Sequence, residues 1–260
     1  MESTRRFDSL KALAPEKKVY FASDFHLGAP NKGESRIRER KIIEWLEQVR
    51  KDASAIFLVG DVFDFWFEYS HVIPKGFTRF LGKLAEISDS GIPIYLFSGN
   101  HDLWYKDYFT EELSIAVIHD PISIEIGKTS FYIGHGDGLG KGDRSFKAIK
   151  RLFKSGLAQW MFRWLHPDIG VSIANFWSRS SRSKSLSKDE KFLGEQERLF
   201  QYAKDVEQTR HHDFYIFGHR HLALEMQISD QATYINLGEW FKSNSYLEFD
   251  GQKASLLHFT

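Results

Sequence analysis

Short apolar runs alternate with helical patterns along the first half of the chain. The runs are rich in β-branched and aromatic residues, as expected of buried strands, and they span residues 19–22, 55–59 and 92–97. Between the first two runs, Ile42, Leu46 and Val49 recur at helical spacing. A second helix is expected to open near Pro74 and to stop before Gly91. This alternation is typical of βαβ units with a largely parallel sheet.

The pattern changes in the second half. Residues 115–133 and 214–260 read as short strands separated by turn residues, and we expect these two β-rich pieces to share one sheet. The segment 139–212 between them reads as helical and shows no strand alternation, which indicates an inserted cap. The expected organisation is therefore a core of residues 1–138 and 213–260 that carries a helical cap.

The expected cap is both basic and aromatic. From Lys141 to Lys188 there are eleven Lys or Arg residues against two acids, although 35 basic and 35 acidic residues balance over the whole chain. These basic residues favour either an anionic ligand or, as the plainer alternative, a solvated helix surface. The run from Leu157 to Leu165 is apolar around most of its circumference, so we expect it to be buried in protein or in lipid.

Composition excludes several kinds of chemistry. The net charge of zero argues against a uniformly basic nucleic-acid coat. The absence of cysteine excludes disulfides, zinc ribbons, thiolate nucleophiles and iron–sulfur clusters, so a metal would need His, Asp, Glu or Asn. The first ten residues lack the apolar core of a signal peptide, and no stretch is apolar enough to span a membrane. We therefore expect a cytoplasmic protein, with peripheral membrane contact through the cap.

Five polar clusters lie next to the ends of expected strands. They are Asp24-Phe25-His26, Gly60-Asp61-Val62-Phe63-Asp64, Gly99-Asn100-His101-Asp102, Gly134-His135-Gly136-Asp137 and Gly218-His219-Arg220-His221. Ligands of open α/β sheets bind beyond the carboxyl ends of the strands, so the clusters are expected to converge on one rim. Residues two apart in an extended segment point to one side, so Asp24 with His26, and His219 with His221, are each expected to present two ligands to one place.

The mixture of imidazole, carboxylate and carboxamide groups indicates the metal. It is too rich in nitrogen for calcium or magnesium and suits manganese, with iron or zinc as alternatives. The clusters hold more ligands than one ion needs, which predicts two ions. Two ions about 3.5–4 Å apart can clamp a phosphoryl group and lower the pKa of a bound water.

Taken together, the clusters resemble the calcineurin-like metallophosphoesterase family over residues 17–137 and 213–240. The resemblance implies an α/β fold, a four-layer αββα sandwich of two mixed sheets. It implies one ion held by Asp24, His26, Asp61 and His221, and a second held by Asp61, Asn100, His135 and His219, with Asp61 bridging. His101 corresponds to the leaving-group acid or transition-state stabiliser, and Asp64 to its orienting partner.

Plainer readings exist for several of these residues. Asp64 or Asp102 alone would be taken as a turn or helix cap. The cluster glycines serve tight turns as readily as the close approach of a ligand. Six histidines sit in no cluster and are assigned to surface or core: His71, His119, His166, His211, His212 and His258.

Within this family, the motifs and the basic-aromatic cap are similar to a group of bacterial pyrophosphatases that release UMP and lipid X from UDP-2,3-diacylglucosamine. That resemblance implies a lipid-linked UDP-sugar as substrate, with no nucleic acid and no obligate protein partner. The implied substrate contacts are Asp137, Asp143, Phe146, Arg179, Ser183 and Lys184. One departure is His101, where the group usually has Arg.

Two other classes of function remain as alternatives. The chain could be a binding scaffold with a degenerate site, which metal content and turnover would decide. It could also be a nuclease or cyclic-nucleotide phosphodiesterase of the same family, with the cap holding a polyanion. Binding of nucleic acid through phosphates falls steeply with salt, whereas binding of acyl chains survives it.

Overall fold

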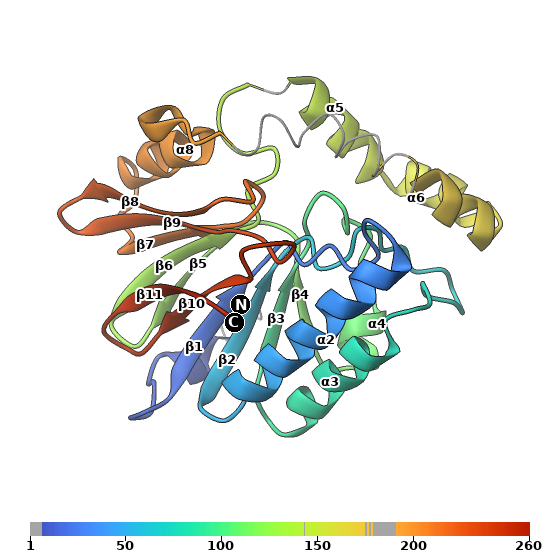
Figure 1. The fold of residues 1–260 in the computed structure, drawn as a ribbon. Coiled ribbons are helices and arrows are strands. Elements are labelled where there is room, and N and C mark those ends of the chain that lie inside the picture. The colour runs from blue at the N-terminus through green and yellow to red at the C-terminus, as the bar shows by residue number, and fades with distance from the viewer. Residues whose placement is uncertain (1–6, 143, 175, 177, 179–190) are drawn as a thin grey trace.

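Two mixed β-sheets form the middle of the molecule, and helices cover their outer faces (Figure 1). The computed structural model describes residues 7–142, 144–174, 176, 178 and 191–260. Three apolar clusters separate the layers: one under each outer layer of helices and one between the two sheets. The expected four-layer αββα sandwich is thereby confirmed.

The first sheet has the strand order β11-β10-β1-β2-β3-β4. Its strands are β1 (Lys18–Ala22), β2 (Ala53–Val59), β3 (Ile94–Phe97), β4 (Ala116–Ile118), β10 (Ser245–Phe249) and β11 (Ala254–His258). The first four run parallel, and β10 pairs antiparallel with β1. The C-terminal β10 and β11 therefore complete a sheet begun by the first strand of the chain.

The second sheet has the order β5-β6-β7-β9-β8. Its strands are β5 (Ile122–Ile126), β6 (Thr129–Gly134), β7 (Phe214–Phe217), β8 (Ala223–Ser229) and β9 (Ala232–Leu237). The expectation that both β-rich pieces share one sheet is wrong in part, because β4, β10 and β11 belong to the first sheet. Alternation of apolar and polar residues predicts that a segment is a strand but not which strand it pairs with. In the structure, β10 pairs with β1, for example through Val19 and Phe249.

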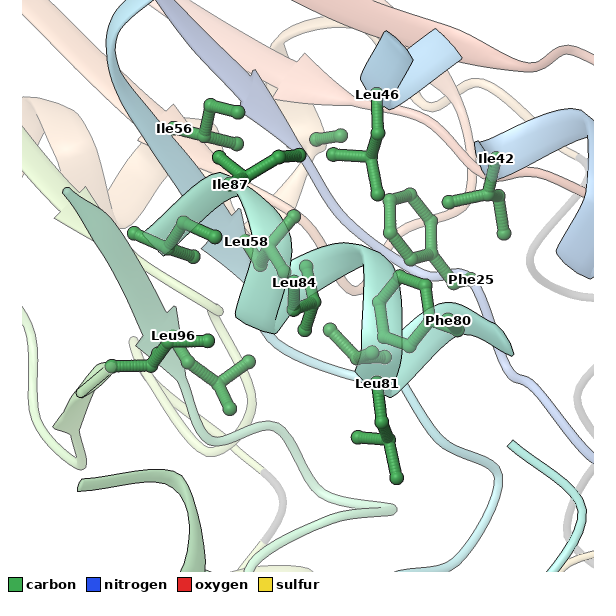
Figure 2. Packing of buried hydrophobic residues seen from close by; sticks show 14 of the residues in the cluster. Phe25, Ile42, Leu46, Ile56, Leu58, Phe80, Leu81, Leu84, Ile87 and Leu96 are labelled. Atoms are coloured by element: carbon green, nitrogen blue, oxygen red, sulfur yellow. The ribbon is translucent and has the colours of Figure 1, made fainter. Parts of the chain in front are cut away.

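Helices α2 (Lys32–Val49), α3 (Thr78–Asp89) and α4 (Tyr108–Glu111) lie on the side of the first sheet (Figure 1). Their apolar residues interlock with those of the strands, as Figure 2 shows for Ile42, Leu46 and Leu84. The second helix begins at Thr78 rather than near Pro74. The physical reason is Gly76, whose φ of 115° no α-helix can include.

The outer face of the second sheet is covered by α8 (Arg198–Glu207), through Leu199, Phe200 and Ala203. This helix lies inside the segment 139–212 that we expect to be the cap, yet it packs as part of the sandwich. Short 3-10 turns, η1 (Asp8–Leu10) and η2 (Gly194–Gln196), precede β1 and α8. The division into core and cap stays a prediction. The packing of α8 places this helix with the core.

The remaining cap helices, α5 (Arg144–Phe153) and α6 (Gly156–Arg163), extend away from the sandwich (Figure 1). They are attached through aromatic side chains. The ring of Phe162 lies 4.7 Å from that of Phe67 and 4.9 Å from that of Trp104, centroid to centroid. The indole nitrogen of Trp104 donates to the carbonyl of Phe153 at 2.8 Å.

The rest of α6 and the turn after it face solvent. The exposed fractions are 68% for Leu157, 58% for Trp160, 60% for Met161 and 75% for Trp164. Burial of this run within the described chain is therefore a wrong expectation: the ring of Phe162 packs on the sandwich, whereas these four side chains stay mostly exposed. The lipid alternative remains open. Along the described residues, no helix combines the length and apolar character needed to cross a membrane.

Candidate active site

The polar clusters follow the carboxyl ends of parallel strands in both sheets. Strands β1, β2 and β3 of the first sheet end just before the first three clusters, and β6 and β7 of the second sheet end just before the last two. Two hydrogen bonds tie the rims together: Trp240 N donates to Asp24 O at 3.2 Å, and His219 N donates to Asp24 Oδ2 at 3.0 Å. All seven expected ligands lie on this shared rim.

One group of possible ligand atoms consists of Asp24, His26 and His221, all within 4.8 Å of one another. The Nε2 atoms of the two histidines are 3.0 Å apart, and His221 Nε2 is 3.1 Å from Asp24 Oδ1. Asp24 and His26 are fully buried. Three atoms that could ligate a metal thus lie close together.

The second group consists of Asp61, His135 and His219. His135 Nε2 lies 3.3 Å from Asp61 Oδ2, which in turn is 3.9 Å from His26 Nε2 of the first group. Asp61 therefore lies between the two groups, where the family resemblance expects a bridging carboxylate.

The histidine pair after β7 divides between the groups. His221 belongs to the first group and His219 to the second. The expectation that this pair presents both rings to one place is wrong, because the two rings belong to different groups. The rule for extended segments applies neither to this pair nor to Asp24 and His26, since all four residues have φ angles between 43° and 68°.

Left-handed backbone conformation is concentrated in these ligands. The φ angles are 56° for Asp24, 43° for His26 and 50° for Asp61, in addition to the two histidines after β7. Each such conformation costs a residue other than glycine about 1–2 kcal/mol. Strain of this kind persists where the surroundings hold it and is typical of functional sites.

Several ligand atoms have no hydrogen-bond partner within the described structure. Asp24 Oδ1, Asn100 Oδ1 and His135 Nε2 are buried and unsatisfied. An orphaned buried polar atom costs about 1–3 kcal/mol, so a stable protein needs a reason for three of them in one place. His135 Nδ1 lies 2.9 Å from the carbonyl of Val59, which can only accept, so Nε2 is the nitrogen left to bind a metal in the neutral ring. These atoms fit divalent metal ions as their missing partners.

The electrostatics agree with ligation. Burial lowers the pKa of His26 to about 3 and, aided by the charge of His135, that of His219 to about 4, so both rings are neutral at pH 7. Burial also acts to lower the pKa of His135, but the Asp61 carboxylate outweighs it and raises that pKa to about 10. The high value reports a strongly negative field at His135, which cations would neutralise.

Two cluster glycines are required by close approach. A Cβ at Gly99 would lie 2.6 Å from the backbone nitrogen of Asp61, and one at Gly218 would lie 2.6 Å from Asp24 Oδ2. For these two positions, the structure decides between the readings that the sequence leaves open. Their role is to let a metal-ligating loop pass.

A model of the calcineurin-like phosphoesterase family matches residues 17–223. The chain belongs to this family. The phosphoesterase is 41% identical to the UDP-2,3-diacylglucosamine hydrolase of Porphyromonas gingivalis, over 90% of this chain and 94% of that protein. It is 26% identical to the protein of the same name from Actinobacillus succinogenes, over 90% and 97% of the two chains.

Among solved structures, the phosphoesterase resembles Yfce, a phosphoesterase from E. coli. Their sequence identity is 14% and their TM-score 0.43, over 94% of this chain and all of that one. Membership of a metallophosphoesterase family implies divalent metal ions, and the two groups of converging residues are candidates for holding them.

An arginine that sequence reasoning missed holds the first metal-ligating loop of the phosphoesterase. Arg38, buried on α2, donates to the carbonyls of Phe25 at 2.7 Å, His26 at 2.7 Å and Ala29 at 2.5 Å. Its guanidinium also lies 4.1 Å from the ring centroid of Phe241, which stacks on His26. A charged residue one helical turn before Ile42, on the buried face, was the available signal.

Asp102 holds the second loop. Its carboxylate accepts from the backbone nitrogens of Gly99 at 2.7 Å, Val62 at 2.8 Å and Phe63 at 3.2 Å, and from Tyr105 Oη at 2.5 Å. The plainer reading of this residue as a cap of local backbone therefore agrees with the geometry. The turn that it fixes is the one that presents Asp61.

His101 lies beside these two groups, and its ring forms a third set of possible ligand atoms with His26 and Asp61, within 4.8 Å of one another. Its backbone nitrogen donates to Asp61 Oδ1 at 2.8 Å, and its ring meets that of His26 edge to face, with centroids 4.8 Å apart. Its Nδ1 is 3.1 Å from the main-chain oxygen of Asp64 and 3.6 Å from the Asp64 carboxylate. The nearest orienting atom is thus the Asp64 carbonyl rather than the side chain.

The expected substrate contacts are described only in part. Asp137 is buried, and its carboxylate pairs with Lys150 Nζ at 2.5 Å, which ties α5 to the core. Phe146 belongs to α5, but its side chain is outside the description. The other four lie outside the described residues: Asp143, Arg179, Ser183 and Lys184. Within the described chain, none of the six unclustered histidines joins a metal-ligating group.

Proposed function

We propose that this chain is a dinuclear metal-dependent hydrolase that splits the pyrophosphate of UDP-2,3-diacylglucosamine into UMP and lipid X, in lipid A synthesis. The observation that carries the reaction type is the convergence of ligand atoms from both sheets around Asp61, whose carboxylate lies 3.3 Å from His135 Nε2 and 3.9 Å from His26 Nε2. The substrate rests on relatives named UDP-2,3-diacylglucosamine hydrolase, which match nearly the whole chain.

The two ions, taken to be Mn²⁺ with Fe or Zn as alternatives, are each assigned a ligand set. Asp24, His26, Asp61 and His221 hold one, and Asp61, Asn100, His135 and His219 hold the other. Mixed nitrogen and oxygen donors suit these metals. The orphaned oxygen of Asn100 supports its place in the second set.

In the reaction, bound divalent ions supply charge neutralisation at the phosphoryl oxygens and a lowered pKa for a bound water. His101 stands at the edge of this centre with Nδ1 turned toward the carbonyl of Asp64. Its Nε2 is then the atom that delivers a proton to the departing oxygen. Histidine can donate near neutral pH, whereas arginine at this position can only stabilise charge.

The cap is proposed to bring the enzyme to its lipid substrate. Nine apolar residues from Leu152 to Phe176 are substantially exposed, and the preceding helix α5 carries the basic residues Arg144, Lys147, Lys150 and Arg151. A large exposed apolar surface next to a basic helix is typical of a membrane interface. We place the enzyme peripherally on the cytoplasmic face of the inner membrane.

The deciding experiment measures turnover of UDP-2,3-diacylglucosamine with added Mn²⁺, beside bis-p-nitrophenyl phosphate and a UDP-sugar without acyl chains. Strong preference for the diacyl substrate with release of UMP is expected. Activity on the generic diester alone would retain the phosphoesterase chemistry and refute the substrate. His101→Ala should lower turnover while keeping metal, and full activity in that variant would refute its role.

A further inference from the structure

One buried side chain of the cap reaches the candidate active site. Ser178 lies four residues beyond the helical segment 167–174 of the cap, and only 7% of it is exposed. Its hydroxyl donates to Asp64 Oδ1 at 2.8 Å and lies 3.3 Å from His101 Nδ1. The sequence motifs do not indicate this contact, because Ser178 is 77 residues from His101 along the chain.

The hydroxyl fills a gap between two groups that do not touch directly. The Asp64 carboxylate is 3.6 Å from His101 Nδ1, beyond ordinary hydrogen-bond distance. Ser178 Oγ is within 3.3 Å of both. As a donor it satisfies the buried carboxylate, and as an acceptor it faces the ring N–H that also points to the carbonyl of Asp64.

The loop that carries Asp64 also packs against the cap. Phe65 and Phe67 of this loop contact the ring of Phe162 on α6, with centroids 6.1 Å and 4.7 Å away. Farther along, Tyr69 packs so closely that a Cβ at Gly170 of the cap would lie 2.7 Å from its hydroxyl. The loop that carries the Asp64 carboxylate is therefore also the loop that contacts the cap.

We infer that Ser178 is a positioning residue, which fixes the Asp64 carboxylate and the His101 ring and so links the docked cap to departure of the leaving group. The inference rests on the role of His101 in the proposed function. A residue that orients a general acid matters most when the leaving group is poor, because a good leaving group departs without help from a proton.

The test uses the full-length, Mn²⁺-loaded enzyme and two diesters, bis-p-nitrophenyl phosphate with a good leaving group and diphenyl phosphate with a poorer one. The matched variants are Ser178→Thr and Ser178→Val, which share a shape and differ in the hydroxyl. We expect Ser178→Val to lower kcat on diphenyl phosphate by about tenfold or more, within the range of general acid catalysis. Its kcat on the nitrophenyl diester and its KM should change far less, and Ser178→Thr should retain both activities.

Two measurements do not depend on turnover. Calorimetric titration should show the same Mn²⁺ binding in both variants. In the ¹⁵N NMR spectrum of the metal-free protein, Ser178→Val should shift the Nδ1 resonance of His101 and Ser178→Thr should leave it in place. The resonance is assigned by its absence from His101→Asn.

The outcomes distinguish the positioning role of Ser178 from the proposed leaving-group role of His101. If Thr and Val behave alike, or if both diesters slow equally, Ser178 serves packing alone and the inference fails. If His101→Asn slows the poor leaving group selectively while Ser178→Val does not, the role of His101 stands and the role of Ser178 is overturned. If His101→Asn itself shows no such selectivity, the proposed leaving-group role is refuted.

Discussion

At the scale of the residue, the proposed metal ligands carry backbone strain that can be measured. His221 has a φ of 55°, a conformation that glycine adopts freely and alanine does not. We predict that, without metal, His221→Gly is more stable than His221→Ala by about 1 kcal/mol in urea unfolding. Both variants lose the same ligand, so their difference reports the backbone alone.

The control for this prediction is Arg40, an exposed position inside α2. There the order should reverse, because glycine in a helix interior is about 1 kcal/mol less stable than alanine. If His221→Ala proved as stable as His221→Gly, strain at this ligand would be ruled out.

Individual residues also show what the motifs could and could not foretell. Asp24, His26 and Asp61 converge as expected, because each follows a parallel strand of one sheet and the ends of such strands meet at one edge. Arg38 and Ser178 escaped notice, because their importance lies in partners distant along the chain. Helical or strand spacing predicts neither the contact of Arg38 with a carbonyl 12 residues away nor that of Ser178 with a carboxylate 114 residues away.

At the scale of the element, α6 and the turn after it offer an exposed apolar face. We predict that Trp160→Ser combined with Trp164→Ser weakens flotation with anionic phospholipid vesicles at low salt by about tenfold or more, since each buried CH₂ contributes about 0.8 kcal/mol. Both tryptophans are more than half exposed, so the fold should be unaffected.

Ile37→Ser provides the matched control, because Ile37 is 71% exposed on α2 rather than on the cap. It should leave flotation unchanged. Equal binding of the double variant and the wild type would argue that α6 does not meet the membrane.

The sequence predicts the bounds of some helices and strands better than those of others, for physical reasons. Strands β1 and β2 and helix α2 were anticipated to within a few residues except at the start of the helix, because burial of one face imposes a clear period. The start of α3 was misplaced, since Pro74 favours a first turn but Gly76 two residues later forbids one. The sheet of β10 and β11 could not be foreseen, because alternation contains no information about partners.

At the scale of the whole molecule, the ligands of both proposed ions come from both sheets, so metal should stabilise the sandwich. A ligand that binds only the folded state at 100 times its Kd adds about 2.7 kcal/mol. We predict that saturating Mn²⁺ raises the Tm of the wild type by several degrees and that Asp61→Ala, which removes the shared carboxylate, abolishes this rise. Differential scanning calorimetry measures both.

Asp205→Ala is a suitable control, because Asp205 lies on α8 and pairs only loosely with Lys141, at 3.7 Å. It should respond to Mn²⁺ as the wild type does. A rise in Tm that survives in Asp61→Ala would show that the two ions are held independently of the shared carboxylate.

Because β1 pairs with β10, the first sheet can be completed only late in synthesis of the chain. The edge of β1 that faces β10 stays open until residues 245–249 have been made, and two of the proposed ligands, His219 and His221, also arrive late. At about 5–20 residues per second, the ribosome needs tens of seconds to bridge that interval. Throughout it, the nascent chain presents an unpaired strand edge that can capture other chains. The enzyme can load its metal only once translation is nearly over.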